Sequence, residues 1–390
     1  MKYSSLRILG LSLALAAFLA AAPAAESPAE VSIRKAQALI QQKPDHVPYY
    51  NALAMAYARR ARETSDVAFY QKAEDTLTKS FELSPNNIEG MKVRAWLLLG
   101  RHEFAKALEV ASTLNKQTPD DVTVYGYLVD ANAELGNYPQ AVGAAQWMLN
   151  IRPGNVPGLT RAAYLRELHG DLEGAMDLMQ SAYDSVPFQE SEDRAWLLTQ
   201  LSHLNYVAGN LKQAEMYASG ALQLFPGYHY ALGALAQVRI SQARYDEAVT
   251  LLQRRADAVP HAENLYSLAD ALDLAGRHAD AAKVWTQFEA KALAESNIAD
   301  NANHELIAYY AGPGHQPAKA IAIAEQELAR RHDIFTYDCY AQALAAAGDY
   351  TKAEMRMQKA QATGVKDPKV LAHAHDIEMH LKSGPEVAKR

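Results

Sequence analysis

The sequence predicts an all-α fold, an α-solenoid in which about nine helical hairpins stack into a right-handed superhelix. Small alanines recur along most of the chain at intervals of 33 to 39 residues, and a proline follows each of the first six alanines twelve residues later. This period is typical of stacked helix pairs, each of which packs only on its neighbours. The nine phasing positions are Ala73, Ala107, Ala141, Ala175, Ala214, Ala248, Ala281, Ala320 and Ala353.

We expect residues 1–25 to be a secretory signal peptide. Lys2 and Arg7 precede an apolar run, residues 8–22. Small residues near Ala24 or Ala25 then offer a cleavage site. An uncleaved N-terminal anchor is the alternative. The mature chain is then expected to be exported, either periplasmic or secreted, and to contain no transmembrane segment.

The rest of the chain divides by its repeat phase. Residues 26–46 are expected to hold a half-repeat helix and residues 47–367 the array itself. Residues 368–382 form a polar helix, which suits the exposed end of a repeat stack because an array needs a cap to cover its last apolar face. Residues 383–390 are expected to be a flexible tail.

The segment 122–153 shows how one repeat is built. An apolar stripe at helical spacing marks its first helix and consists of Tyr125, Leu128, Ala131 and Leu135. Gly136 ends that helix, because glycine takes the left-handed conformation that a tight hairpin needs. Ala141 is expected where the two helix axes approach most closely. A larger side chain there would overpack, at a cost of about 1–3 kcal/mol.

The same plan recurs at Gly170 to Leu172 before Ala175, and at Gly348 to Tyr350 before Ala353. On these residues the chain resembles tetratricopeptide repeat proteins, whose pattern Gly-Asp-Tyr-x-x-Ala…Pro it restates over roughly residues 31–367. It is also similar to exported bacterial proteins of this type, a group that implies no specific activity. The resemblance implies a superhelix that binds protein or peptide on a concave face lined by the first helix of each hairpin.

Three insertions depart from the period. About seven extra residues around 60–69 carry several charges and predict a longer, solvated hairpin. Five more residues follow Pro187 and form an acidic connection, residues 188–193. A third insertion lies between Ala281 and Ala320 and includes a loop at 311–315 with three helix breakers. Tolerated insertion and functional loop are both open readings of these segments.

Composition argues against several functions. The formal net charge is −7 and becomes 36 minus 45, or −9, without the first 25 residues, which disfavours general binding to nucleic acid. Cys339 is the single cysteine and is expected to be a small buried thiol. Catalytic motifs are missing, and the many carboxylates are expected on water-facing positions where they titrate normally. The sequence therefore predicts no enzyme activity and no cofactor.

A metal or small-ligand carrier is one alternative function. His373, Asp376 and His380 lie at i, i+3 and i+7 and are able to share one face of the final helix. A solvated capping face explains the same residues equally well. An envelope assembly or secretion accessory factor is the other alternative.

The preferred hypothesis is a protein- or peptide-binding scaffold or adaptor in the cell envelope. Counting back from each phasing alanine gives the residues expected on the concave face. Several are aromatic, as at protein interfaces, and the later ones are acidic and suit a basic segment of a partner. The set is Trp96, Tyr164, His203, Tyr206, Tyr230, Tyr266, Asp270, Asp273, Glu305, Tyr309 and Asp338. The oligomeric state is left open.

Overall fold

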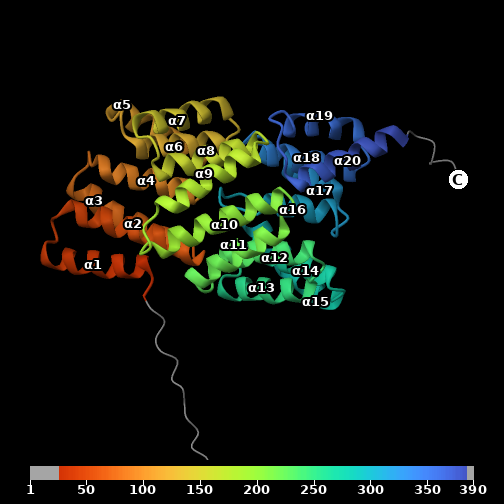
Figure 1. Cartoon of the computed structure of the whole chain (residues 1–390), viewed down its shortest axis with the longest axis horizontal. Coiled ribbons are helices and arrows are strands. Elements are labelled where there is room, and N and C mark those ends of the chain that lie inside the picture. The colour runs from red at the N-terminus through yellow and green to blue at the C-terminus, as the bar shows by residue number, and fades with distance from the viewer. Residues whose placement is uncertain (1–25, 384–390) are drawn as a thin grey trace, which may run out of the picture.

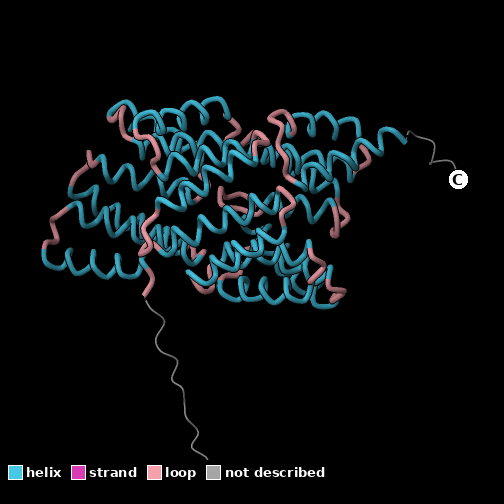
Figure 2. Tube along the Cα trace, viewed as in Figure 1, coloured by secondary structure: helices cyan, strands magenta, loops and turns pink. Residues whose placement is uncertain are grey.

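The computed structural model describes residues 26–383, and within this range every regular element is a helix (Figure 2). The predicted signal peptide and the last seven residues of the chain lie outside the described residues. None of the helices between Pro28 and Ser383 is long and apolar enough to cross a membrane.

The helices follow one another with short connections. Their bounds are α1 (Pro28–Gln42), α2 (Val47–Thr64), α3 (Ala68–Leu83), α4 (Ile88–Gly100), α5 (Phe104–Gln117), α6 (Val122–Glu134), α7 (Tyr138–Ile151), α8 (Val156–Leu168), α9 (Leu172–Ser185), α10 (Ser191–Val207), α11 (Leu211–Leu224), α12 (His229–Ser241), α13 (Tyr245–Ala258), α14 (Ala262–Leu274), α15 (His278–Glu295), α16 (Asn303–Ala311), α17 (Pro317–Leu328), α18 (Ile334–Ala346), α19 (Tyr350–Ala360) and α20 (Pro368–Ser383). Nine hairpins, from α2–α3 to α18–α19, lie between α1 and α20 in this part of the chain. The predicted all-α solenoid is confirmed.

The phasing alanines do what their spacing predicts. Each lies on the second helix of a hairpin, and each of the nine is 0% exposed. A methyl group at this point lets the two axes come close, so that the larger apolar side chains on either side interdigitate. Several of the first helices begin at side-chain caps: Asn87 accepts from Gly90 N–H before α4, Asp121 from Thr123 N–H before α6, and Asn155 from Gly158 N–H before α8.

The hairpins coil into a superhelix that returns to its own beginning. In Figure 1 the chain runs from α1–α4 at the left through α5–α9 along the top, crosses the middle and bottom with α10–α15, and comes back with α16–α20. The turns within early hairpins then touch the connections between late hairpins, about 196 residues further along the chain. His261 Nε2 donates to the Ser65 carbonyl at 2.5 Å, and Ile334 N–H donates to the Tyr138 hydroxyl at 2.9 Å.

We call this line of contacts the seam. Its early side consists of Ser65, His102, Leu135, Tyr138 and Gly170, and its late side of His261, Asp300, His332, Ile334 and Gly364. Because it follows four successive hairpins, the seam closes the concave side of the superhelix into an interior. An open groove, as the sequence suggests for the binding face, is therefore not what the fold provides.

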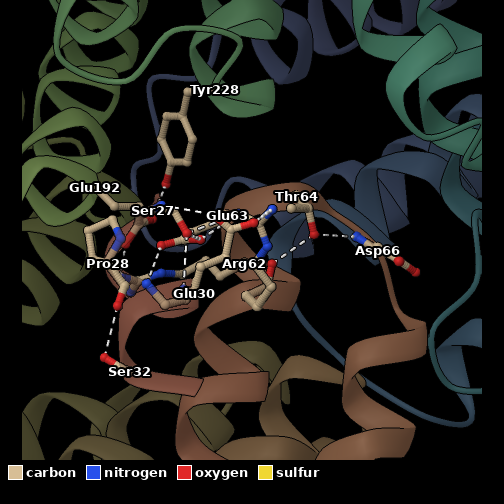
Figure 3. A network of polar contacts seen from close by, with 12 residues as sticks. Ser27, Pro28, Glu30, Ser32, Arg62, Glu63, Thr64, Asp66, Glu192 and Tyr228 are labelled. Carbon is tan, nitrogen blue, oxygen red and sulfur yellow. Dashed lines mark hydrogen bonds and ion pairs between the residues drawn. The ribbon is translucent and has the colours of Figure 1, made fainter. Parts of the chain in front are cut away.

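Two of the insertions meet across this closure. Arg62, near the end of α2, pairs with Glu192 and, at 2.5 Å, with Asp193, while Arg59 lies 3.2 Å from Glu190. We call these five residues the clasp. Figure 3 shows Arg62 next to Glu192, which also accepts a hydrogen bond of 2.6 Å from the Tyr228 hydroxyl. The basic insertion of the first hairpin thus binds the acidic segment at the start of α10, where Glu190 is the N-cap and Glu192 and Asp193 lie in the first turn rather than in a connection.

The prediction of a solvated hairpin at residues 60–69 is wrong for the residues nearest the clasp. Glu63 is only 4% exposed, because its carboxylate accepts from Ser27 Oγ at 2.5 Å and from Ala29 N–H at 3.0 Å at the start of α1 (Figure 3). Arg60 adds an ion pair of 2.9 Å to the same carboxylate. The extra residues lengthen α2 and bury its charged end between α1 and α10.

Replacing Gly136 by alanine should destabilise the protein more than replacing Gly348. Both glycines have positive φ in the turn of a hairpin, so either alanine costs about 1 kcal/mol in backbone strain. A Cβ on Gly136 would lie 2.4 Å from the His332 carbonyl oxygen across the seam, whereas a Cβ on Gly348 would meet nothing within 4 Å. We expect Gly136→Ala to lose about 2 kcal/mol more than Gly348→Ala in urea unfolding. Equal losses would mean that the seam is not closed at this point in solution.

Candidate functional site

The interior is lined by the first helices of the hairpins, and much of its polar surface is paired between neighbouring helices. Arg161 on α8 lies 2.6 Å from Asp130 on α6. Tyr164 donates its hydroxyl to Glu134 at 3.2 Å. Glu134 also faces Arg331 at 3.7 Å, although Arg331 belongs to the connection before α18 on the other side of the seam. These side chains therefore face the enclosed space.

Tyr164, His203 and Asp338, three of the residues predicted for the concave face, belong to this set of paired groups. His203 Nε2 lies 2.6 Å from Glu167, and His373 Nδ1 lies 3.0 Å from Asp338. Burial alone would lower the pKa of His203, but the hydrogen bond and charge of Glu167 raise it above the ordinary value. These three side chains already have partners within the array.

Tyr266, Tyr309 and Asp273 join an aromatic cluster around Trp285. The ring of Trp285 lies 5.0 Å from that of Tyr309 and 5.3 Å from that of Tyr266. Its indole N–H donates to Asp273 at 2.7 Å. This cluster fixes α15 against α14 and α16, so packing within the array accounts for all three predicted residues.

Trp96 packs between the two apolar clusters of the first hairpins, which again is packing within the array. Four predicted residues remain: Tyr206, Tyr230, Asp270 and Glu305. Tyr206 is half-buried, and Tyr230 is 39% exposed with its ring 3.9 Å from that of His229. Asp270 and Glu305 are half-buried, and neither makes a side-chain hydrogen bond or ion pair with another residue between 26 and 383.

The two unpaired carboxylates do not titrate normally, contrary to the expectation from the sequence. Burial and the charge of Glu263 raise the pKa of Glu305 to about 7. Burial also raises the pKa of Asp270, and Asp273 adds to this effect. The charge of Lys369 on α20 opposes both shifts. A carboxylate that is partly removed from water and has no partner favours the binding of a cation, because the cation compensates its charge.

Glu305 lines a cavity of about 560 Å³ beneath the seam. The walls come from both sides: His102 and Phe104 at the start of α5, and His304, Glu305 and Arg331 from the late hairpins. A smaller cavity of about 210 Å³ adjoins it, since His102, Glu263 and Asn301 line both. The walls of the second cavity also include Tyr70, His229, Tyr230 and His261.

The sequence did not predict most of the residues that line these cavities. The phase of the repeat identifies side chains that face inward, but His102, His229 and His261 lie at turns and helix starts, outside that pattern. The only hint was charge: arginines in one insertion and acids in another, 130 residues apart. Complementary insertions of this kind indicate a contact between distant hairpins.

The metal hypothesis gains no support from the geometry. Between residues 26 and 383 no group of three or more His, Cys, Asp or Glu side chains is arranged to hold a metal ion. His373 is paired with Asp338, and the ring of His380 stacks on Tyr350 at 4.4 Å. Cys339 is half-buried, and burial raises the pKa of its thiol. None of these groups is poised to act as a ligand or a nucleophile.

Comparison with known proteins gives the family of the repeat. Residues 206–271 match the tetratricopeptide repeat family model. No curated protein matches the chain. In the crystal structure of the APC/C hetero-tetramer Cut9-Hcn1 the similarity covers 84% of this chain and 55% of that chain, at 14% identity and a TM-score of 0.50. This chain thus spans about half the length of that neighbour.

Human IFIT1 is also similar in structure. Its dimer with PPP-AAAA matches over 87% of this chain and 95% of its own, at 11% identity and a TM-score of 0.53. The dimer with m7Gppp-AAAA matches over 85% of both chains, at 12% identity and a TM-score of 0.55. At such identities the likeness concerns the fold alone. Together with the family match, it confirms the predicted resemblance to tetratricopeptide repeat proteins.

Glu305→Gln should change how stability depends on pH. An ordinary glutamate ionises near pH 4.5, whereas Glu305 in the folded protein ionises near pH 7. In this interval the folded state holds a proton that the unfolded state has released, so the contribution of Glu305 to folding stability falls as pH rises. Glutamine carries no such proton. We expect the variant to gain stability over the wild type from pH 4.5 to 7 and to level off above, by at most about 3 kcal/mol.

Urea unfolding of both proteins across this pH range measures the effect, with exposed Glu354→Gln on α19 as the control. A difference between wild type and Glu305→Gln that stays constant from pH 4.5 to 8 would contradict the burial of an unpaired carboxylate.

Proposed function

We propose that this chain is a non-catalytic scaffold that binds a protein segment through the interior of its superhelix, with a Lys or Arg side chain of the partner seated at Glu305. Its tetratricopeptide fold supports the coarse part of this proposal, because proteins of this fold bind proteins or peptides. The unpaired carboxylates support the finer part.

Glu305 is the observation that carries the proposal. Its side chain lines the larger cavity and has no partner among the described residues. Burial and the charge of Glu263 raise its pKa to about 7. A cationic side chain would convert this unfavourable site into a charge-assisted hydrogen bond, a contact worth about 1.5–3 kcal/mol. Tyr230 lines the smaller cavity that adjoins this one and offers aromatic surface, so the two cavities together provide both charge and contact area.

An anionic ligand suits this interior less well. The IFIT1 structures hold PPP-AAAA or m7Gppp-AAAA, and IFIT1 shares the fold with this chain. Here, however, Arg62, Arg330 and Arg331 at the cavity walls are already paired with carboxylates, whereas Glu305 and Asp270 are free. The net charge of −7 acts in the same direction. We therefore assign the interior to a basic protein segment rather than to nucleic acid.

The place of action is part of the proposal. The apolar run at residues 8–22 and the small residues after it support export into the cell envelope. N-terminal sequencing of the protein from its native host tests this directly, with cleavage near Ala24 or Ala25 as the expected result.

A Lys-containing peptide should bind the wild type at least tenfold more tightly than it binds Glu305→Gln. Fluorescence anisotropy with a labelled nine-residue peptide, Lys against Gln at its centre, measures this, and an oligoadenylate of similar length serves as the anionic probe. Tenfold corresponds to about 1.4 kcal/mol, the lower end for a charged hydrogen bond. Affinity for the Lys peptide should rise from pH 6 to 8, because Glu305 ionises near pH 7 and the anion binds the cation.

Two further variants complete the experiment. Lys369→Met removes the chain's own nearby cation and should tighten binding, whereas exposed Glu354→Gln should change nothing. Equal affinity for the Lys and Gln peptides, or preference for the oligoadenylate, would refute the assignment of a basic ligand.

A further inference from the structure

The two ends of the seam are held by different chemistry. One apolar cluster contains Tyr125, Leu165 and Leu168 from the third and fourth hairpins together with Tyr340 and Val365 from the last. Residues 169–235 contribute nothing to that cluster, so its two parts are joined across the seam. At this end, α6–α8 belong to the same buried apolar cluster as α17–α20, and water does not weaken packing of this kind.

The other end of the seam is polar. The apolar clusters of the first two hairpins span Ala54 to Leu97 and Ala95 to Tyr127, and neither includes a buried residue of α10–α16 within the described chain. The clasp holds this end instead, with Arg59, Glu190 and Asp193 side chains that are 26%, 44% and 38% exposed. Three histidines add single contacts: His229 to the Arg62 carbonyl at 2.8 Å, His261 to the Ser65 carbonyl, and His102 to Asp300 at 3.3 Å.

Contacts of this kind are able to exchange with water. Partly exposed ion pairs contribute little net stability, since their charges regain hydration when they separate. Even Glu192, whose side chain is 1% exposed, would recover water if α2 moved away from α10. The polar end therefore opens at lower free energy than the apolar end.

Both cavities lie at the polar end. The larger has walls from the start of α5 on one side and from α16, the connection before α16 and the connection after α17 on the other. The smaller lies between α2–α3 and the starts of α12 and α14. If the polar end parts, both cavities become open grooves and Glu305 becomes accessible from the side.

We propose that the polar end of the seam is a gate. The unit α1–α5 swings away from α10–α16 while α6–α8 stay packed on α17–α20, and an extended, unfolded segment of the partner enters sideways before the gate closes over it. The identity of that partner as a basic segment rests on the proposed function, but the gate itself does not. A folded domain does not fit a space of about 560 Å³, so the partner is an unfolded stretch of chain.

Spin labels placed across the polar end test the motion without any ligand. Thr78→Cys on α3 and Arg254→Cys on α13 provide exposed sites, in a Cys339→Ala background. We expect a single distance at low salt and a second, longer population at 1 M NaCl, because salt screens the exposed pairs of the clasp. A pair within the late hairpins, Arg254→Cys with Met355→Cys, should not change.

Removing the charges of the clasp should open the polar end of the seam, as 1 M NaCl is expected to do. The triple variant Arg59→Gln, Arg62→Gln and Glu192→Gln removes both signs of charge, so that no carboxylate is left buried without a partner. It should show the longer distance at low salt and bind the Lys peptide at least tenfold faster in stopped flow. The matched control is Arg94→Gln with Glu74→Gln, an ion pair of similar exposure between adjacent hairpins that does not cross the seam.

The route is tested with the same peptide flanked on both sides by folded domains. Sideways access predicts that this fusion binds at a rate within about threefold of the free peptide, whereas threading along the axis would require a free end and would block it.

Outcomes of the two readouts separate the hypotheses. Distances that stay the same at 1 M NaCl and in the triple variant would overturn the gate, and so would exclusion of the double fusion. If the triple variant does not fold, the salt series on the wild type decides alone. If the longer distance appears but neither peptide binds, the proposed gate is supported and the proposed basic ligand is refuted.

Discussion

The return of the superhelix onto itself is the constraint on which the rest of the structure depends. Each hairpin rotates relative to the one before it, and the rotation is fixed by how closely the helices approach at the phasing alanines. Because this approach is uniform, the turns of early hairpins arrive opposite the connections of late ones at a nearly constant separation in sequence. A stack of local units thereby acquires contacts that no single unit specifies.

Closure changes the chemistry of the side chains on the inner face. In an open superhelix Glu305 and Asp270 would face water, and burial would not hold their pKa values above the ordinary range. In the coiled array the same carboxylates are half-buried, and burial and the charge of Glu263 raise the pKa of Glu305 to about 7. Most other polar groups of the interior are not left without a partner, because they pair between neighbouring helices, as Glu167 and His203 do. The groups left without partners are the ones available to a ligand.

The apolar end of the seam holds the early and late hairpins together, and the polar end is the part that we propose opens to admit the partner. Apolar packing joins α6–α8 to α17–α20, whereas the clasp and three histidines close the part that covers the cavities. Insertions that look like decoration of the repeat in sequence are the elements that make this closure: one lengthens α2 and the other supplies the acids at the start of α10.

The sequence by itself determined the helical hairpins, because the information is local: a glycine in most turns, a side-chain cap before several first helices and an alanine at each close approach. It also located inward-facing positions such as Tyr164, His203 and Glu305 from the repeat phase. Only the tertiary structure decided which of these are spent on packing, as with Tyr266 and Tyr309 beside Trp285, and which stay free, as with Glu305. The reason is that pairing and enclosure arise between hairpins about 196 residues apart, where small rotations add up over many units and no local pattern records the sum.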